Sequence, residues 1–160
     1  MSEMTVKRAI ETAIKAEELG ITFYSELARK LSANQELKSV FELLSKDEVE
    51  HKRQFTDLLK GIKGDVSISK LDSAFMSGVD IASYFPAMET VNMNLKPSEI
   101  LKSAYDFEKD SVLYYSAIRD IIGTNPVIDE IIRMEKLHMT QLFKYISTER
   151  KFRGLSDSWD

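Results

Sequence analysis

The sequence has no cysteine, only three prolines, six glycines and two histidines among 160 residues. Without thiols the chain cannot form disulfides, zinc ribbons or iron–sulfur clusters, so any bound metal must be held by oxygen atoms and imidazole nitrogens. The scarcity of proline and glycine leaves long stretches rich in Leu, Glu, Lys, Ala and Ile, which favour helix over sheet. We therefore predict an all-α protein.

A net positive charge and long hydrophobic runs are also lacking. A net charge of −4 offers no positive field for a phosphate backbone, so nucleic acid is not an expected partner. Residues 1–8 lack the apolar core of a signal peptide, and no segment approaches the ~18 consecutive apolar residues of a membrane-spanning helix. We expect a cytoplasmic protein with no membrane partner.

Apolar residues recur with a helical period in four long segments. Only a short break, at residues 32–34, separates the first two segments. We therefore expect the two helices to lie side by side and antiparallel. Glycine, proline and asparagine interrupt residues 61–96, which we interpret as a crossover with one short helix. We predict one four-helix domain over residues 1–149 and a tail over 150–160. The expected helices are Val6–Leu31, Glu36–Lys60, Pro97–Ile122 and Val127–Thr148, with the short one at Leu71–Tyr84.

Each of the two histidines lies three residues after a glutamate: His51 follows Glu48, and His138 follows Glu135. Three residues of a helix turn by about 300° and rise ~4.5 Å, so carboxylate and imidazole project from nearly the same side. One such pair is half of a metal site. A single pair is explained as well by two surface neighbours on a charged helix, but repetition at both histidines indicates a metal site.

The two halves of the chain repeat this pattern. Aligning the third expected helix on the first pairs Glu108 with Glu17, and aligning the fourth on the second superposes the two Glu-x-x-His pairs. Each half thus carries one glutamate and one Glu-x-x-His. The six side chains could clamp two metal ions between them: Glu17, Glu48, His51, Glu108, Glu135 and His138.

Two further acidic residues lie near His51, namely Asp47 and Glu50. Met134 and Leu137 occupy the corresponding places before His138. The repeat therefore selects the glutamate of each Glu-x-x-His pair and not its neighbours.

These motifs resemble the rubrerythrin branch of the ferritin-like di-iron carboxylate proteins over about residues 5–149. The resemblance implies a ferritin-like antiparallel four-helix bundle with a long crossover between its second and third helices. It also implies a non-haem centre of two Fe ions that reacts with hydrogen peroxide or dioxygen. The residues that carry it are Glu17 followed by Phe23-Tyr24, Glu48-x-x-His51, Glu108 followed by Tyr114-Tyr115, and Glu135-x-x-His138.

The chain departs from rubrerythrins in two ways. Rubrerythrins usually append a small iron domain held by four cysteines, and this chain has none, so reducing electrons must come from an external electron donor. They also carry a further glutamate one turn after the third-helix ligand, where this chain has Ser111. In this respect the six-residue set is more similar to ferritins and bacterioferritins.

An oxidoreductase that reduces hydrogen peroxide or dioxygen is the preferred interpretation, with a homodimer as the expected assembly. The alternative is an iron-binding ferroxidase that stores or detoxifies iron without sustained turnover. Manganese or a mixed-metal pair would suit the same ligands. A purely structural bundle is the weakest interpretation, because it leaves inward-facing glutamates unpaired.

Two pairs of nearby residues carry further hypotheses. Tyr24 and Tyr115 lie two turns beyond Glu17 and Glu108. They are either core tyrosines whose hydroxyl finds a hydrogen bond, or functional residues. As functional residues they would donate a hydrogen bond to a bridging carboxylate, or be oxidised to protect or relay electrons at the metals. Gly20 lies inside the first expected helix, where glycine destabilises the helix by about 1 kcal/mol relative to alanine. One hypothesis is that Gly20 and its counterpart Ser111 leave open volume for the oxidant beside the metals. The alternative is that these small residues allow the helices to pack closely.

Overall fold

The structure is a computed structural model that describes residues 3–79, 81 and 97–151, and it contains five α-helices in these ranges. The all-α prediction is confirmed, and the four long helices end within three residues of their expected bounds. The short helix begins one residue before the expected Leu71–Tyr84, whose last residues lie outside the described ranges. The helices are α1 (Val6–Lys30), α2 (Gln35–Gly61), α3 (Lys70–Val79), α5 (Pro97–Ile122) and α6 (Pro126–Lys151).

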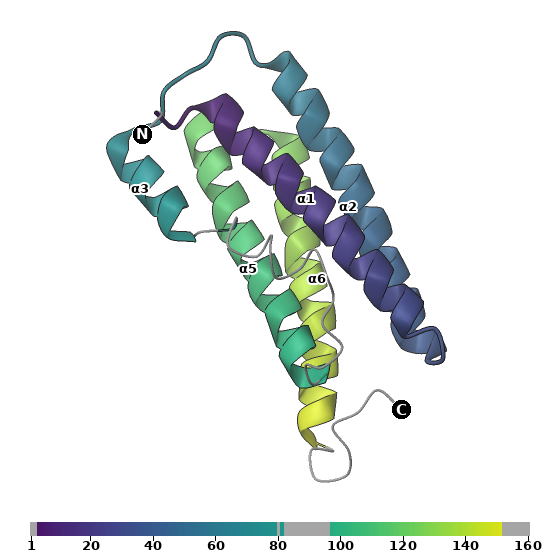
Figure 1. The fold of residues 1–160 in the computed structure, drawn as a ribbon. Helices are drawn as coiled ribbons and strands as arrows, with labels where there is room; N and C mark the ends of the chain where they lie inside the picture. The colour runs from purple at the N-terminus through teal and green to yellow at the C-terminus, as the bar shows by residue number, and fades with distance from the viewer. Residues whose placement is uncertain (1–2, 80, 82–96, 152–160) are drawn as a thin grey trace.

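Two helix hairpins form the bundle (Figure 1). α1 packs along α2, and α5 packs along α6; the hairpins meet through α1 against α5 and α2 against α6. α3 lies beside α5, outside the four long helices. The one-domain prediction over 1–149 stays a prediction, because residues 80 and 82–96 of the expected crossover, and most of the tail, lie outside the described residues.

Side-chain caps and one glycine set the helix ends. The side-chain oxygens of Thr5 and Asn34 accept the amide hydrogens of the first turns of α1 and α2, and Asn125 does the same for α6. Each cap satisfies a backbone donor that the helix itself leaves unpaired. After α5, Gly123 has a φ of 86°, a conformation that other residues rarely adopt, so it ends this helix.

The chain segment after α2 returns to the start of α1. The amide of Val6 donates to the carbonyl of Val66, and the amide of Ile68 donates to the carbonyl of Met4. This short antiparallel pairing fixes the beginning of the crossover against the N-terminal end of α1. Ile68 is buried there, and Met76 of α3 is buried next in sequence.

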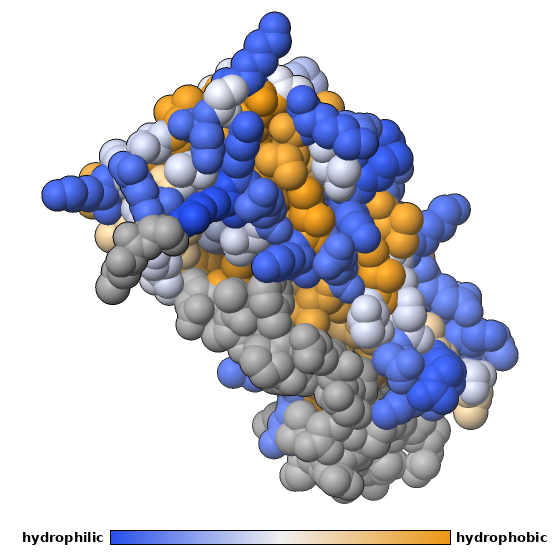
Figure 2. Space-filling view, turned by 45° about the horizontal axis from the view of Figure 1, so that its top comes forward, coloured by the Kyte–Doolittle hydropathy of each residue, from blue (hydrophilic) through white to orange (hydrophobic). Residues whose placement is uncertain are grey.

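The core is the shared apolar face of the four long helices. Its largest fully buried side chains include Phe41, Phe55 and Phe107. On the face shown in Figure 2, hydrophilic side chains flank a narrow strip of hydrophobic surface, as expected when helices are apolar on one side. No helix in the described ranges is long and apolar enough to cross a bilayer.

Candidate metal centre

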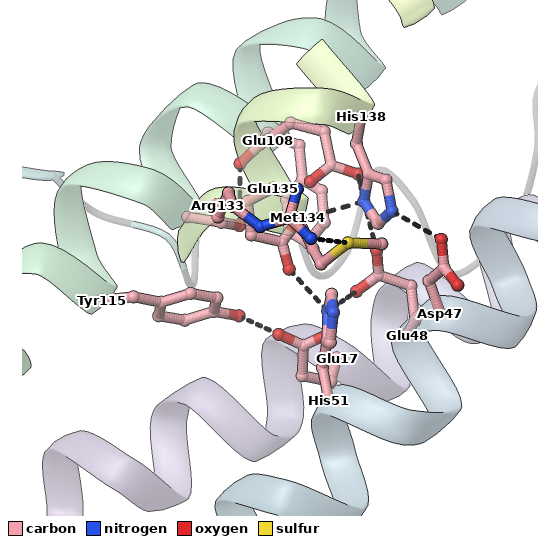
Figure 3. A network of polar contacts seen from close by, with 12 residues as sticks. Glu17, Asp47, Glu48, His51, Glu108, Tyr115, Arg133, Met134, Glu135 and His138 are labelled. Carbon is pink, nitrogen blue, oxygen red and sulfur yellow. Dashed lines mark hydrogen bonds and ion pairs between the residues drawn. The ribbon is translucent and has the colours of Figure 1, made fainter. Parts of the chain in front are cut away.

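Six acidic and imidazole side chains meet inside the bundle (Figure 3). Each of the four long helices contributes: α1 and α5 one glutamate each, α2 and α6 one Glu-x-x-His pair each. Every one of the six is at most 3% exposed. The structure therefore brings together the whole predicted set, Glu17, Glu48, His51, Glu108, Glu135 and His138.

Ligand-type atoms of these residues form two groups, and within each group all lie within 4.8 Å of one another. Glu48 and Glu135 belong to both groups. One group adds Glu17 and His51, and the other adds Glu108 and His138. The two shared carboxylates thus lie between the histidines, in the position from which a carboxylate can bridge two cations.

His51 turns its Nδ1 atom towards the carboxylates. This nitrogen lies 2.8 Å from Glu135 Oε1, 3.6 Å from Glu17 Oε2 and 3.9 Å from Glu48 Oε2. Its nearest carboxylate is therefore on the opposite hairpin, and the pair joins α2 to α6.

His138 has the equivalent environment in the other half. Its Nδ1 lies 3.1 Å from Glu48 Oε1, 3.2 Å from Glu135 Oε2 and 3.6 Å from Glu108 Oε1. The two imidazole rings lie 5.8 Å apart between centroids. The internal repeat of the sequence is thus present in space as a two-fold arrangement of ligand-type atoms.

Burial and mutual repulsion control the pKa values of this cluster. Burial and the facing carboxylate of Glu135 raise the pKa of Glu108 to about 8, and the same two causes raise the pKa of Glu48 well above its ordinary value. Burial lowers the pKa of His51, but the carboxylates of Glu135 and Glu17 outweigh it and raise that pKa to about 10. Protons must neutralise part of the cluster unless cations do so.

Several of these buried atoms have no hydrogen-bond partner within the described residues. His51 Nδ1 is among them, because its close approach to Glu135 lacks the alignment that a hydrogen bond needs. A buried polar atom without a partner costs about 1–3 kcal/mol, and more when charged. Metal ions would satisfy such atoms, and carboxylate oxygen with imidazole nitrogen suits divalent iron or manganese. The orphaned atoms are Glu17 Oε2, Glu48 Oε1, His51 Nδ1, Glu108 Oε2 and Glu135 Oε1.

The two tyrosines contact the cluster across the hairpins. The hydroxyl of Tyr24 donates to Glu108 Oε1 at 2.5 Å, and the hydroxyl of Tyr115 donates to Glu17 Oε1 at 2.6 Å. Both tyrosines are fully buried. They hold the two carboxylates that belong to only one group each, and the hypothesis that they serve a bridging carboxylate or relay electrons stays a prediction. Each reaches the glutamate of the other half, because α1 and α5 run antiparallel.

Gly20 does not leave open volume beside the cluster. A Cβ atom at Gly20 would lie 3.2 Å from Cγ of Glu48, so the side chain of Glu48 occupies the space that the glycine leaves. Ser111 is buried, and its hydroxyl donates to the carbonyl of Phe107 at 2.9 Å. The close-packing interpretation of Gly20 therefore holds, since a larger residue would press on a shared carboxylate.

Asp47 is a polar partner of the cluster that the sequence argument set aside. Its Oδ2 lies 3.1 Å from Nε2 of His138, the ring nitrogen that faces away from the other carboxylates. Burial lowers the pKa of His138, but this hydrogen bond and the carboxylate of Glu108 outweigh it and raise that pKa. The alignment of the two halves excluded Asp47 because its counterpart is Met134, and a repeat gives no signal for a contact that only one half makes.

The sequence matches the Rubrerythrin family over residues 9–95, more than half of the chain. This chain belongs to the rubrerythrin family. A search of curated proteins found no significant match. A crystal structure from Thermotoga maritima, provisionally described as a ferritin-like diiron-carboxylate protein, is similar with a TM-score of 0.71 and 25% sequence identity, covering 92% of this chain and 97% of the other. That coverage extends the likeness into α5 and α6, beyond the family match.

Proposed function

We propose that this rubrerythrin-family protein is a non-haem di-iron oxidoreductase that reduces hydrogen peroxide or dioxygen. The observation that carries the proposal is the pair of four-residue groups that share Glu48 and Glu135. Six buried side chains with that connectivity suit two cations held side by side. A purely structural role would leave buried carboxylates facing one another without compensation.

The proposed ligand assignment follows the two groups. Glu17 and His51 would hold one iron, Glu108 and His138 the other, and Glu48 and Glu135 would bridge them. Two ions bound there would supply two electrons, one each, which is the number needed to reduce one peroxide with two protons to two waters.

The surrounding residues hold the cluster in place. Tyr24 and Tyr115 donate their hydroxyl protons to Glu108 and Glu17, so each unshared carboxylate keeps one fixed oxygen. Burial in the apolar core keeps bulk water from the carboxylates and strengthens these hydrogen bonds. These contacts would maintain the ligand geometry through repeated oxidation and reduction.

Electrons for a second turnover have to come from outside this chain. It contains no cysteine, so it holds no thiolate-bound iron that could relay them. The proposal therefore includes an external electron donor, a small oxidant as the substrate, and a homodimer in the cytoplasm as the setting.

The test starts with metal analysis of protein purified from its own host. The protein is then reduced without oxygen and mixed rapidly with hydrogen peroxide or with oxygen, with an external electron donor present. We expect two irons per chain, much faster oxidation by peroxide than by oxygen, and repeated turnover. Zinc-loaded protein is the control, because zinc is redox-inert and should leave peroxide unchanged.

Two outcomes would contradict the proposal. Oxidation by oxygen that is as fast as by peroxide, with many irons accumulating per chain and no turnover, would indicate iron storage or detoxification instead. Manganese as the native metal would contradict the di-iron assignment while leaving the ligand set intact.

A further inference from the structure

Asp47 breaks the two-fold arrangement of the centre. Its side chain is 23% exposed, whereas the His138 side chain that it contacts is 1% exposed. It therefore lies between the buried cluster and solvent, on α2, and reaches across to a histidine on α6. Figure 3 shows Asp47 on the side of His138 that faces away from Glu135.

The contact fixes the state of the His138 ring. An ionised carboxylate only accepts hydrogen bonds, so Nε2 of His138 must carry the proton that Asp47 accepts at 3.1 Å. In the neutral ring, Nδ1 then presents its lone pair to the side where Glu48 and Glu135 lie, 3.1 and 3.2 Å away. A carboxylate that accepts from a metal-binding histidine holds the ring in one orientation and makes it a stronger ligand.

His51 has no such support among the residues that the structure describes. The internal repeat aligns Asp47 with Met134 of α6, so the other half has a methionine at the position that corresponds to Asp47. A thioether is at most a weak acceptor. Within the described ranges, no side chain forms a hydrogen bond or an ion pair with Nε2 of His51, although its Nδ1 has three carboxylates within 3.9 Å.

We propose that Asp47 is a positioning residue that makes the metal site of His138 stronger than the site of His51. This inference rests on the proposed function, since it requires both groups to bind metal. It adds that the two ions are unequal: the ion beside His138 binds more tightly, and the ion beside His51 is lost first.

The test isolates each half of the centre. His51→Ala leaves the half of His138, and His138→Ala leaves the half of His51; each is combined with Asp47→Ala. The full-length chains are freed of metal and titrated without oxygen with Co²⁺, whose visible absorption reports binding. We expect Asp47→Ala to weaken Co²⁺ binding by about 10–100-fold in the His51→Ala protein and to leave it unchanged in the His138→Ala protein.

Controls separate positioning from charge and from folding. Asp57→Ala removes the same residue type from α2, where Asp57 is exposed and paired with Arg53, and should change neither half. Asp47→Asn is nearly isosteric and should keep the fold while still weakening the half of His138. Met134→Asp should strengthen Co²⁺ binding in the His138→Ala protein by supplying the missing acceptor.

The results distinguish the inference from the function on which it rests. Equal weakening of both halves by Asp47→Ala, or no weakening of either, would overturn the proposal. A complete lack of Co²⁺ binding by the unsubstituted chain would instead overturn the proposed metal centre.

Discussion

Tyr24 and Tyr115 each join the two hairpins through one hydroxyl. Both lie about 10.5 Å along their helices from the glutamate seven residues earlier, too far to contact it directly. Antiparallel packing of α1 on α5 brings each instead to the glutamate of the other helix. The sequence could indicate that these tyrosines point inward, but not which carboxylate they reach, because the partner depends on packing between hairpins.

Removing one of these hydroxyls should destabilise the protein. Tyr24→Phe leaves Glu108 buried with one fewer donor, so we expect the free energy of unfolding to fall by about 1–3 kcal/mol. Denaturant titration of the metal-loaded protein measures this. Tyr145→Phe is the matched control, because the Tyr145 hydroxyl donates to Glu36 in an exposed contact at 3.0 Å. A loss at Tyr24 no larger than that at Tyr145 would contradict the account.

Most of the candidate site could be predicted residue by residue from the internal repeat. The six side chains repeat in type and spacing, and spacing on a helix determines direction. The role of Asp47 could not be predicted in the same way, because aligning the two halves identifies only residues that both halves contain. Its contact with His138 crosses between α2 and α6, so it depends on a register that no local pattern contains.

At the scale of helices, Gly20 lies where α1 and α2 pack closely against each other. Gly20 should cost α1 about 1 kcal/mol relative to alanine, yet a Cβ there would lie only 3.2 Å from Cγ of Glu48. Because glycine has no Cβ atom, the shared carboxylate of Glu48 can lie against the backbone of α1. The close approach of the two helices therefore positions a ligand as well as packing the core.

Gly20→Ala should separate these two effects. We expect weaker metal binding, because the added methyl group displaces Glu48, and the gain in helix propensity should not appear as higher stability. Gly78→Ala is the matched control: this helical glycine in α3 has open space at its Cβ position, so it should keep metal affinity and gain up to about 1 kcal/mol. Equal metal binding by both variants, measured by titration, would show that Glu48 tolerates the methyl group.

The helices themselves could be predicted because the apolar period and the capping residues mark the same helix ends. Thr5, Asn34 and Asn125 lie where the apolar period begins, and Gly123 lies where it ends. The short helix begins within one residue of its expected start, because the apolar pattern begins there. Its position beside α5 depends on tertiary contacts, which a period cannot specify.

At the scale of the whole molecule, the metal centre depends on four carboxylates buried in one bundle. The fold brings them together because two similar hairpins pack face to face, an arrangement that the repeated halves of the sequence predicted. The ligand groups then overlap at Glu48 and Glu135. This overlap could not be read from the repeat alone, which pairs Glu17 with Glu108 and Glu48 with Glu135 but does not say which pair lies between the two groups. It follows from α2 packing against α6.

The most direct test of the central claim is the number of metal ions bound per chain, measured by elemental analysis after anaerobic loading with Fe²⁺. The unsubstituted chain should bind two ions. Glu135→Ala should lose most of both, because Glu135 belongs to both groups. Glu50→Ala should keep two, since Glu50 is exposed and paired with Arg53 on the surface. Retention of two ions by Glu135→Ala would contradict the shared site.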